Sequence, residues 1–145
     1  MPNGRPAIRG FGPSKSDSKS GATPAGTSRR QQAEHRGRVA EWIAATALML
    51  KGYRILARRL RGPYGEIDLI AVRGRRLAFV EVKQRRSGAD AAAALTSRQA
   101  SRLGNAAERW LWKHPRYQGH EIGLDAVLLG AALWPRHVPN ALHRW

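Results

Sequence analysis

The segment "GEIDLIAVRGRRLAFVEVK", residues 65–83, contains two apolar runs that are separated by a short Gly-Arg turn. The runs over 66–72 and 77–83 are typical of two core strands. Three acids, Glu66, Asp68 and Glu81, interrupt these otherwise apolar runs. Burying a carboxylate in a sheet is costly unless something neutralises it, so the three acids need an explanation.

The turn between the two runs predicts how the acids are arranged. Glycine at the first central position of Gly74-Arg75 favours a type II′ hairpin, in which Arg73 pairs with Arg76. Because side chains alternate along a strand, this register predicts four polar residues on one face and four apolar residues on the other. The polar four are Glu66 opposite Lys83 and Asp68 opposite Glu81, and the apolar four are Ile67, Leu69, Val80 and Val82.

Directly opposed carboxylates would repel each other in this hairpin. At about 5 Å the repulsion is roughly 3 kcal/mol for an effective dielectric constant of about 20. One acid can stay protonated, Lys83 or a nearby arginine can balance the pair, or a divalent cation can bridge it. Oxygen ligands suit Mg²⁺ or Mn²⁺ better than Zn²⁺. A salt-bridged hairpin without metal remains the alternative.

The rest of the chain predicts one α/β or α+β domain with the element order α-β-β-β-α-β. The predicted elements are a helix over 35–51, strands over 53–60, 66–72 and 77–83, a helix over 97–113 and a strand over 121–130. The first helix is predicted from the helical spacing of Val39, Trp42, Ile43, Ala47 and Leu50. Residues 1–34 are predicted to form a disordered, basic, Gly/Pro/Ser-rich tail, and 134–145 an irregular C-terminal segment.

Composition narrows the class of partner. The 145 residues contain 26 Lys and Arg against 10 Asp and Glu, a formal net charge of +16 that favours a polyanion such as nucleic acid. Arginine accumulation in a GC-rich genome would give the same excess. The chain has no cysteine, which excludes disulfides and thiolate metal sites. Without a long apolar stretch or a secretory signal, we expect no membrane association and a cytoplasmic location.

A longer set of motifs resembles a known family. Asp68 followed by Glu81-Val82-Lys83 is similar to the PD-(D/E)xK motif of restriction-endonuclease-like nucleases. The surrounding strings resemble the YraN-like family of small bacterial proteins over about residues 35–130, and these strings are "RGRVAEWIAA", "GYRILARRLR", "GEIDLIA", "FVEVKQR", "SRQASRL" and "LDAVLL". The resemblance implies a restriction-endonuclease-like core, a mixed central sheet flanked by helices, in an endonuclease-like domain over residues 35–133.

The resemblance also implies roles for individual residues. Asp68, Glu81 and Glu41 would be catalytic ligands of Mg²⁺ or Mn²⁺, and Lys83 would orient the attacking water and stabilise the charged transition state. A solvated Glu41 paired with Arg38 is the alternative for that helix position. Glu66 is expected to form a salt bridge with Lys83 rather than to bind metal. The sequence departs from the pattern in having Ile67 before Asp68 and Arg98 in place of a lysine, and Asp125 matches a family acid without an assigned role.

Nucleic acid is the expected partner, with DNA favoured over RNA. The residues expected to contact it are Arg85, Arg98, Arg102 and Arg109, three of which fall on one arc of the helix over 97–113 together with Lys113. A solvated helix face is the alternative. The function that this pattern predicts is a magnesium-dependent endonuclease, structure-selective or nonspecific. A non-catalytic nucleic-acid-binding module of the same fold and a basic RNA- or ribosome-associated protein are the rivals, and a homodimer stays open.

Overall fold

The computed structural model describes residues 24–63, 65–84, 97–130 and 134–142. Its elements are α1 (Pro24–Leu50), β1 (Arg54–Gly62), β2 (Gly65–Arg73), β3 (Arg76–Gln84), α2 (Ser97–Lys113), a short 3₁₀ helix η1 (Pro115–Tyr117), β4 (Glu121–Leu129) and β5 (Arg136–Val138). The order of the first six α and β elements is the predicted one. The helix predicted over 97–113 has the predicted bounds.

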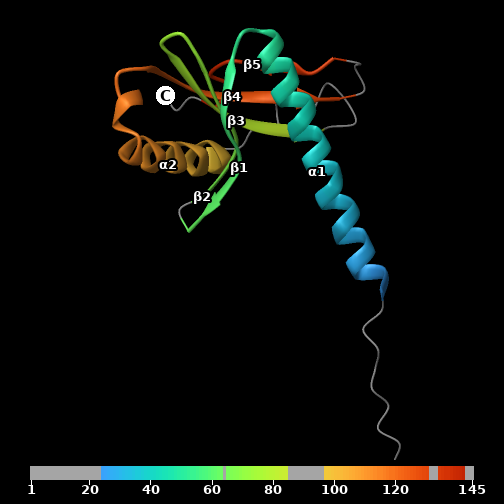
Figure 1. Cartoon of the computed structure of the whole chain (residues 1–145). Coiled ribbons are helices and arrows are strands. Elements are labelled where there is room, and N and C mark those ends of the chain that lie inside the picture. The colour runs from blue at the N-terminus through green and yellow to red at the C-terminus, as the bar shows by residue number, and fades with distance from the viewer. Residues whose placement is uncertain (1–23, 64, 85–96, 131–133, 143–145) are drawn as a thin grey trace, which may run out of the picture.

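The sheet has five strands in the order β1-β2-β3-β4-β5. Strand β2 pairs antiparallel with both β1 and β3, β4 runs parallel to β3, and β5 is antiparallel to β4. The parallel pair requires a crossover, which α2 provides, and α1 packs on the opposite face of the sheet (Figure 1). This mixed sheet flanked by helices confirms the predicted fold class.

The hairpin between β2 and β3 confirms the predicted register only in part. Gly74 has a φ of 56°, as the first central residue of a type II′ turn requires, and Arg73 pairs with Arg76. The ladder then runs as far as the pair of Leu69 and Val80. The predicted continuation to Asp68 is wrong, because β2 leaves β3 at this point while β3 stays paired with β4.

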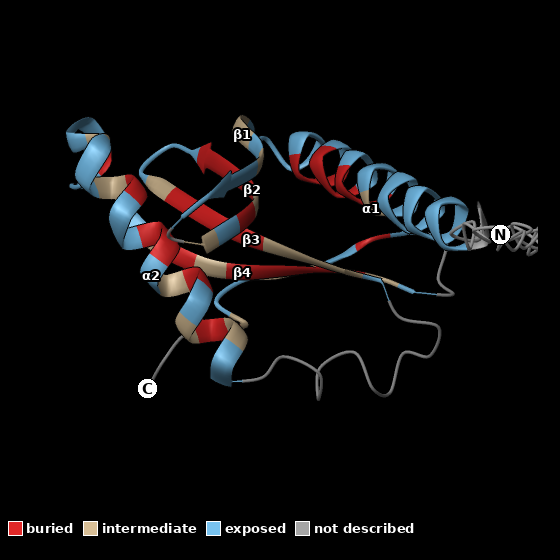
Figure 2. Ribbon diagram, turned by 90° about the horizontal axis from the view of Figure 1, so that it is seen from below, coloured by how far each residue is buried: buried red, intermediate tan, exposed pale blue. Residues whose placement is uncertain are grey.

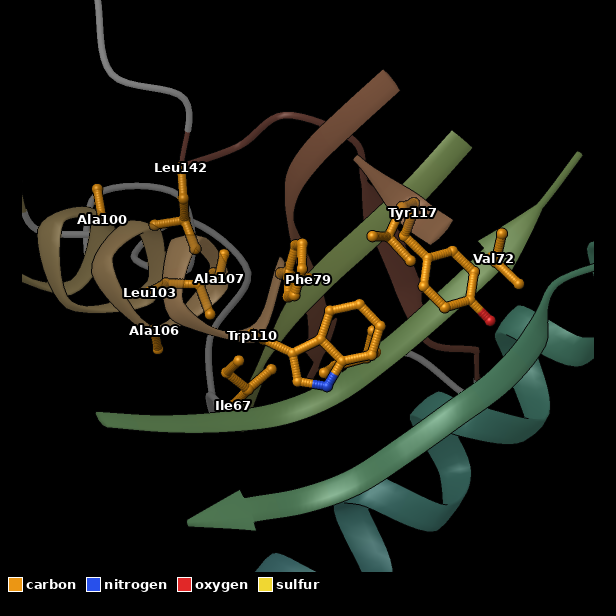
Figure 3. Packing of buried hydrophobic residues seen from close by; sticks show 12 residues of the cluster. Ile67, Val72, Phe79, Ala100, Leu103, Ala106, Ala107, Trp110, Tyr117 and Leu142 are labelled. Atoms are coloured by element: carbon orange, nitrogen blue, oxygen red, sulfur yellow. The ribbon is translucent and has the colours of Figure 1, made fainter. Parts of the chain in front are cut away.

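Two apolar cores lie on the two faces of the sheet (Figure 2). On the α2 face, Trp110 packs against Phe79 with ring centroids 5.7 Å apart, and Ile67 belongs to the same cluster (Figure 3). On the α1 face, Leu69 and Val80 pack together with small residues of the helix. The prediction that Ile67 shares a face with Leu69 is therefore wrong, since β2 no longer alternates regularly where it separates from β3.

Helix α1 differs from the prediction in its start and in its buried face. It begins at Pro24, eleven residues before the predicted start at 35, so residues 24–34 are helical rather than part of a disordered tail. Residues 26–36 are exposed and contain three Arg and two Gln, which favour helix without burial (Figure 2). The buried face consists of Ala40, Ala44, Ala45, Ala47 and Leu48, whereas Val39, Trp42, Ile43 and Leu50 of the predicted stripe are exposed. Small side chains let the helix lie close to the sheet.

The C-terminal segment is more regular than predicted. Strand β5 pairs with β4 within the segment 134–145 that was predicted to be irregular. Leu142 is buried in the core on the α2 face, and its N–H donates to the carbonyl of Leu124. Strand β5 is short and has a proline on each side. Because proline is disfavoured within strands, the sequence did not predict this one. No helix in the described part of the chain is long and apolar enough to span a membrane.

Candidate nuclease-like site

The carboxylate of Asp68 occupies the point where β2 and β3 separate. Its Oδ2 accepts a hydrogen bond of 2.8 Å from the backbone N–H of Val82. This side-chain bond replaces the next rung of the ladder. Asp68 therefore reaches across to the Glu81-Val82 segment instead of lying in a regular pair opposite Glu81. The two acids are still close enough for the charge of Glu81 to act on Asp68.

Lys83 and Glu66 have partners that differ from the predicted ones. Lys83 Nζ lies 2.9 Å from Glu81 Oε1, and both side chains are largely buried. Glu66 is exposed and lies 3.5 Å from the guanidinium of Arg61. The expected salt bridge between Glu66 and Lys83 is therefore wrong. The separation of the strands leaves Lys83 beside the acid two residues earlier on its own strand.

Glu41 lies at this site on the buried side of α1. Its residue exposure is 8%, although its neighbour Trp42 is 56% exposed. Its Oε2 lies 3.5 Å from Nε of Arg59 on β1, so the principal contact of Glu41 is with the sheet and not with Arg38 on its own helix. The structure thus places Glu41 of α1 and Glu81 and Lys83 of β3 close enough to Asp68 of β2 for their charges to act on it.

Asp68 and Glu41 resist ionisation at this site. Burial is the main cause that raises the pKa of Asp68 from 3.8 to about 6, and the charges of Glu81 and Glu41 raise it further. The N–H of Val82 and the ammonium of Lys83 act in the opposite direction but do not outweigh burial. Burial also raises the pKa of Glu41, against the attraction of surrounding arginines. These carboxylates carry an uncompensated cost of being charged.

Sequence reasoning missed the arginines of β1. Arg58, Arg59 and Arg61 all stabilise the charged form of Glu41. The β1–β2 register places Arg59 across from Asp68, its φ is 49°, and its Nη1 is buried with no hydrogen-bond partner among the described residues. The string "RRLR" at 58–61, directly before the Gly-Pro turn that returns the chain to Asp68, is the signal that could have identified them.

The predicted nucleic-acid contacts on α2 lie on the opposite side of the sheet from Glu41. Arg98, Arg102 and Arg109 are exposed on α2, whose opposite side is buried in the core. The helix covers the sheet face opposite to α1 (Figure 2), so this basic arc does not adjoin Glu41. Arg85, the fourth predicted contact, lies outside the described residues. The arginines that act on Glu41 come from β1 and from α1 itself, and Lys83 of β3 is the cation in contact with Glu81.

Asp125, which had no assigned role, forms a separate polar cluster on β4. It is fully buried and accepts hydrogen bonds from Arg76 Nη2 at 2.8 Å, His137 Nε2 at 2.8 Å and the N–H of Asn140 at 2.9 Å. Burial alone would lower the pKa of Arg76, but the charge of Asp125, together with Tyr53 and the charge of Glu121, outweighs it and holds the pKa above its ordinary value. This cluster ties β3, β4 and β5 together.

Comparison with known proteins gives the family. The profile of the Uncharacterised protein family UPF0102 matches residues 40–129. The UPF0102 protein of Nitrobacter winogradskyi is 53% identical over 112 residues, which cover 77% of this chain and 95% of that protein. This chain belongs to the UPF0102 family. The UPF0102 protein of Rhodopseudomonas palustris strain BisB18 is 50% identical over 126 residues, 87% of this chain and 93% of that protein.

The UPF0102 match confirms the predicted family resemblance. The chemistry has to be argued from the residues of the site. The match extends from Ala40 in α1 to the end of β4, so Glu41, Asp68 and Glu81 all lie within it. The names of these UPF0102 relatives state no activity. The family resemblance in the sequence covers the same region, about residues 35–130.

The carboxylate oxygens of this UPF0102 chain are chemically suited to a hard divalent cation. Their side chains would have to move to surround one. Among the described residues, no three His, Cys, Asp or Glu side chains lie close enough together to surround an ion as they stand. Glu41 is turned to Arg59 and Glu81 to Lys83. Asp68 and Glu81 nevertheless supply oxygen donors whose mutual repulsion a cation would relieve. Glu41 can complete the set once it releases Arg59.

Proposed function

We propose that this chain is a magnesium-dependent phosphodiesterase that cleaves DNA, either structure-selectively or without sequence preference. The observation that carries the proposal is the raised pKa of Asp68, a buried carboxylate beside Glu81 and the ammonium of Lys83. Strongly perturbed acids that face other charged groups mark functional sites more often than surface ion pairs do. The +16 formal charge of the chain supports a polyanionic substrate.

Each residue of the site has a role that its surroundings support. Asp68 and Glu81 would hold Mg²⁺ or Mn²⁺, with Glu41 as the third acid. Such an ion polarises a phosphate and lowers the pKa of bound water. Lys83 supplies a compact positive charge and donors that can orient a water or contact a phosphate oxygen. The N–H of Val82 fixes the Asp68 carboxylate, so its direction is set before any ligand binds.

The β1 arginines would place the substrate backbone at the acids. Arg58, Arg59 and Arg61 surround Glu41 and reduce the repulsion between the carboxylates and a polyanion. Among the described residues, Nη1 of Arg59 is buried without a hydrogen-bond partner, so it is a donor that a phosphate oxygen can satisfy.

A second candidate function is a nucleic-acid-binding module that does not cleave. The ion pairs of Glu41 with Arg59 and of Glu81 with Lys83 favour it, because these acids are already balanced by cations of the chain. In that case the acids stabilise the arginine-rich surface rather than hold a metal. DNA binding that is insensitive to divalent ions would distinguish this candidate.

A cleavage assay tests the proposal. Purified protein is incubated with single-stranded, duplex and branched DNA and with RNA, in Mg²⁺, Mn²⁺ or EDTA. We expect metal-dependent cleavage of DNA that falls at least about 100-fold in Asp68→Ala and in Lys83→Ala. Glu108→Gln, which removes an exposed acid from α2, is the matched control and should cleave normally.

Two outcomes would contradict the proposal. Equal cleavage by wild type, Asp68→Ala and Lys83→Ala would mean that the activity does not come from this site. DNA binding without cleavage in either metal would support the binding module. Tighter binding to RNA than to any DNA would favour the RNA-associated rival.

A further inference from the structure

A cavity of about 440 Å³ lies on the α2 side of the sheet, between the β1–β2 turn and α2. Its apolar wall includes Leu56, Leu60, Ile67 and Trp110. Figure 3 shows Ile67 and the Trp110 ring next to each other in the packing at this wall. A volume of this size accommodates a small molecule or one unit of a polymer.

The polar lining of the cavity is almost entirely cationic. Arg61, Arg109, Lys113 and Arg116 contribute to it from β1, α2 and η1, and none of the fifteen lining residues is an acid. The other hydrogen-bonding side chains that line it are those of Trp110, His114 and Tyr117, and its described lining contains no Asn, Gln, Ser or Thr. An apolar wall with several positive charges favours a ligand that has a hydrophobic body and a strongly negative group.

We propose that this cavity binds the terminal nucleotide of a nucleic-acid strand, with the base against the apolar wall and the terminal phosphate at the cations. This inference rests on the proposed function for the identity of the ligand. A terminal phosphate carries up to two negative charges, whereas a phosphodiester within the strand carries one, so four cations favour a strand end.

The cavity and the carboxylate site adjoin along β2. Gly65 and Ile67 line the cavity, and Asp68 is the next residue of the strand. Arg61 lines the cavity and also acts on the charge of Glu41, so it lies within electrostatic reach of both places. A strand whose end is held in the cavity would therefore present a nearby phosphodiester to Asp68. This arrangement selects substrates that have a free end or a flap.

The cavity should accept any base. One face of the Trp110 ring is covered by His114, whose centroid is 3.9 Å away, so the base would contact mainly aliphatic groups and the remaining surface of the indole. The hydroxyl of Tyr117 already accepts a hydrogen bond from Arg116, and no described lining residue carries a side-chain amide, so we expect no specific reading of base edges. We expect similar affinities for purine and pyrimidine nucleotides.

Calorimetric titration in EDTA tests binding without cleavage. The probes are adenosine and thymidine 5′-monophosphate, adenosine, and inorganic phosphate. Both monophosphates should bind with a stoichiometry of one, and adenosine and phosphate at least about tenfold more weakly, because each keeps only half of the contacts. Equal binding of inorganic phosphate and the monophosphates would overturn the proposal, and so would a lack of monophosphate binding.

Two variants of the cavity sharpen the test. Lys113→Gln should weaken monophosphate binding about tenfold, since it removes one charged donor. Ala57→Phe, which fills the cavity from a half-buried position of β1, should abolish it. Lys51→Gln removes an exposed lysine outside the cavity and should bind like wild type. Unchanged binding in a folded Ala57→Phe protein or in Lys113→Gln would place the ligand elsewhere and overturn the proposal.

Oligonucleotides separate a strand end from a free nucleotide. Short single strands with a 5′-phosphate, a 3′-phosphate or only hydroxyl ends are titrated under the same conditions. We expect one phosphorylated end to bind about tenfold more tightly than the hydroxyl form, with the difference lost in Lys113→Gln. Binding of monophosphates but not of phosphorylated strands would overturn the strand-end assignment. Nucleotide binding in a protein that never cleaves would instead contradict the proposed function alone.

Discussion

Asp125 and Asp68 are two carboxylates in the same sheet, the first fully buried and the second half-buried, and their surroundings are opposite. Asp125 accepts hydrogen bonds from Arg76, His137 and the N–H of Asn140, and it forms a 2.8 Å ion pair with Arg76. Asp68 accepts a hydrogen bond from the N–H of Val82 and faces other acids, which together with burial raise its pKa to about 6.

Asp125 therefore stabilises the fold, whereas Asp68 is positioned by the fold and is available to bind a ligand. The partners of Asp125 compensate its desolvation, so its charge contributes to stability. The desolvation of Asp68 is not compensated within the described chain, so its charge costs stability. A divalent cation would remove that cost, which is why the second environment supports a ligand and the first does not.

The largest expected effect comes from removing the compensated acid. Asp125→Ala leaves Arg76 and His137 with buried groups that have lost their main partner, so we expect the free energy of unfolding to fall by about 3–5 kcal/mol. Urea denaturation measures it. Gly123→Ala should shift stability in the same direction by less, because the added Cβ would collide with the Arg76 guanidinium. Wild-type stability in both variants would show that this cluster does not anchor the sheet.

The opposite sign is expected for the uncompensated acid. Asp68→Asn keeps an oxygen for the N–H of Val82 and removes the charge, so near pH 8 the metal-free protein should become more stable. The difference between a pKa of 3.8 and about 6 corresponds to about 3 kcal/mol at most. The same urea denaturation in EDTA measures it. A loss of stability comparable to that of Asp125→Ala would remove the distinction between the two acids.

The pH dependence of stability follows from the same pKa. Asp68 binds its proton more tightly in the folded chain, with a pKa of about 6, than in the unfolded chain, with a pKa of 3.8. Its contribution to the free energy of unfolding therefore decreases as the pH rises through this window, by at most about 1.4 kcal/mol per pH unit. The difference between wild type and Asp68→Asn, measured from about pH 4 to pH 8, isolates this contribution. A flat difference would mean that Asp68 titrates normally.

The smallest effect is expected at Arg59, which contrasts with Arg76. Arg59→Asn loses a 3.5 Å contact with Glu41 but relieves a left-handed backbone, at φ 49°, that asparagine tolerates better. The two changes nearly cancel, and we expect unfolding free energy to change by less than about 1 kcal/mol. Arg76→Asn is the comparison, and it should cost several times more. Equal losses at both positions would make Arg59 a structural residue.

Much of the fold is readable in local patterns. The Gly74-Arg75 turn defines the hairpin and its first pairs, and the spacing of Leu103, Ala107 and Trp110 defines the buried side of α2. These features depend on backbone preferences and on side-chain periodicity within one element. The site residues were predicted through the motif that contains Asp68, Glu81 and Lys83.

The features that were not predicted depend on contacts between elements. The end of the β2–β3 ladder depends on the hydrogen bond between the Asp68 side chain and Val82, which no alternation pattern contains. The buried face of α1 depends on how closely the helix approaches the sheet, so small alanines are buried while Trp42 and Ile43 stay exposed. Extrapolating a regular period therefore misplaced the partners of Glu81.

Divalent-cation binding tests the central claim most directly. Isothermal titration of Mn²⁺ and Mg²⁺ into the wild-type protein near pH 8 should show one ion bound per chain. Asp68→Asn and Glu81→Gln should abolish this binding, and Glu108→Gln should retain it. Absence of binding in wild type, or equal binding in Asp68→Asn, would contradict the claim that Asp68 of β2 and Glu81 of β3 form a metal site.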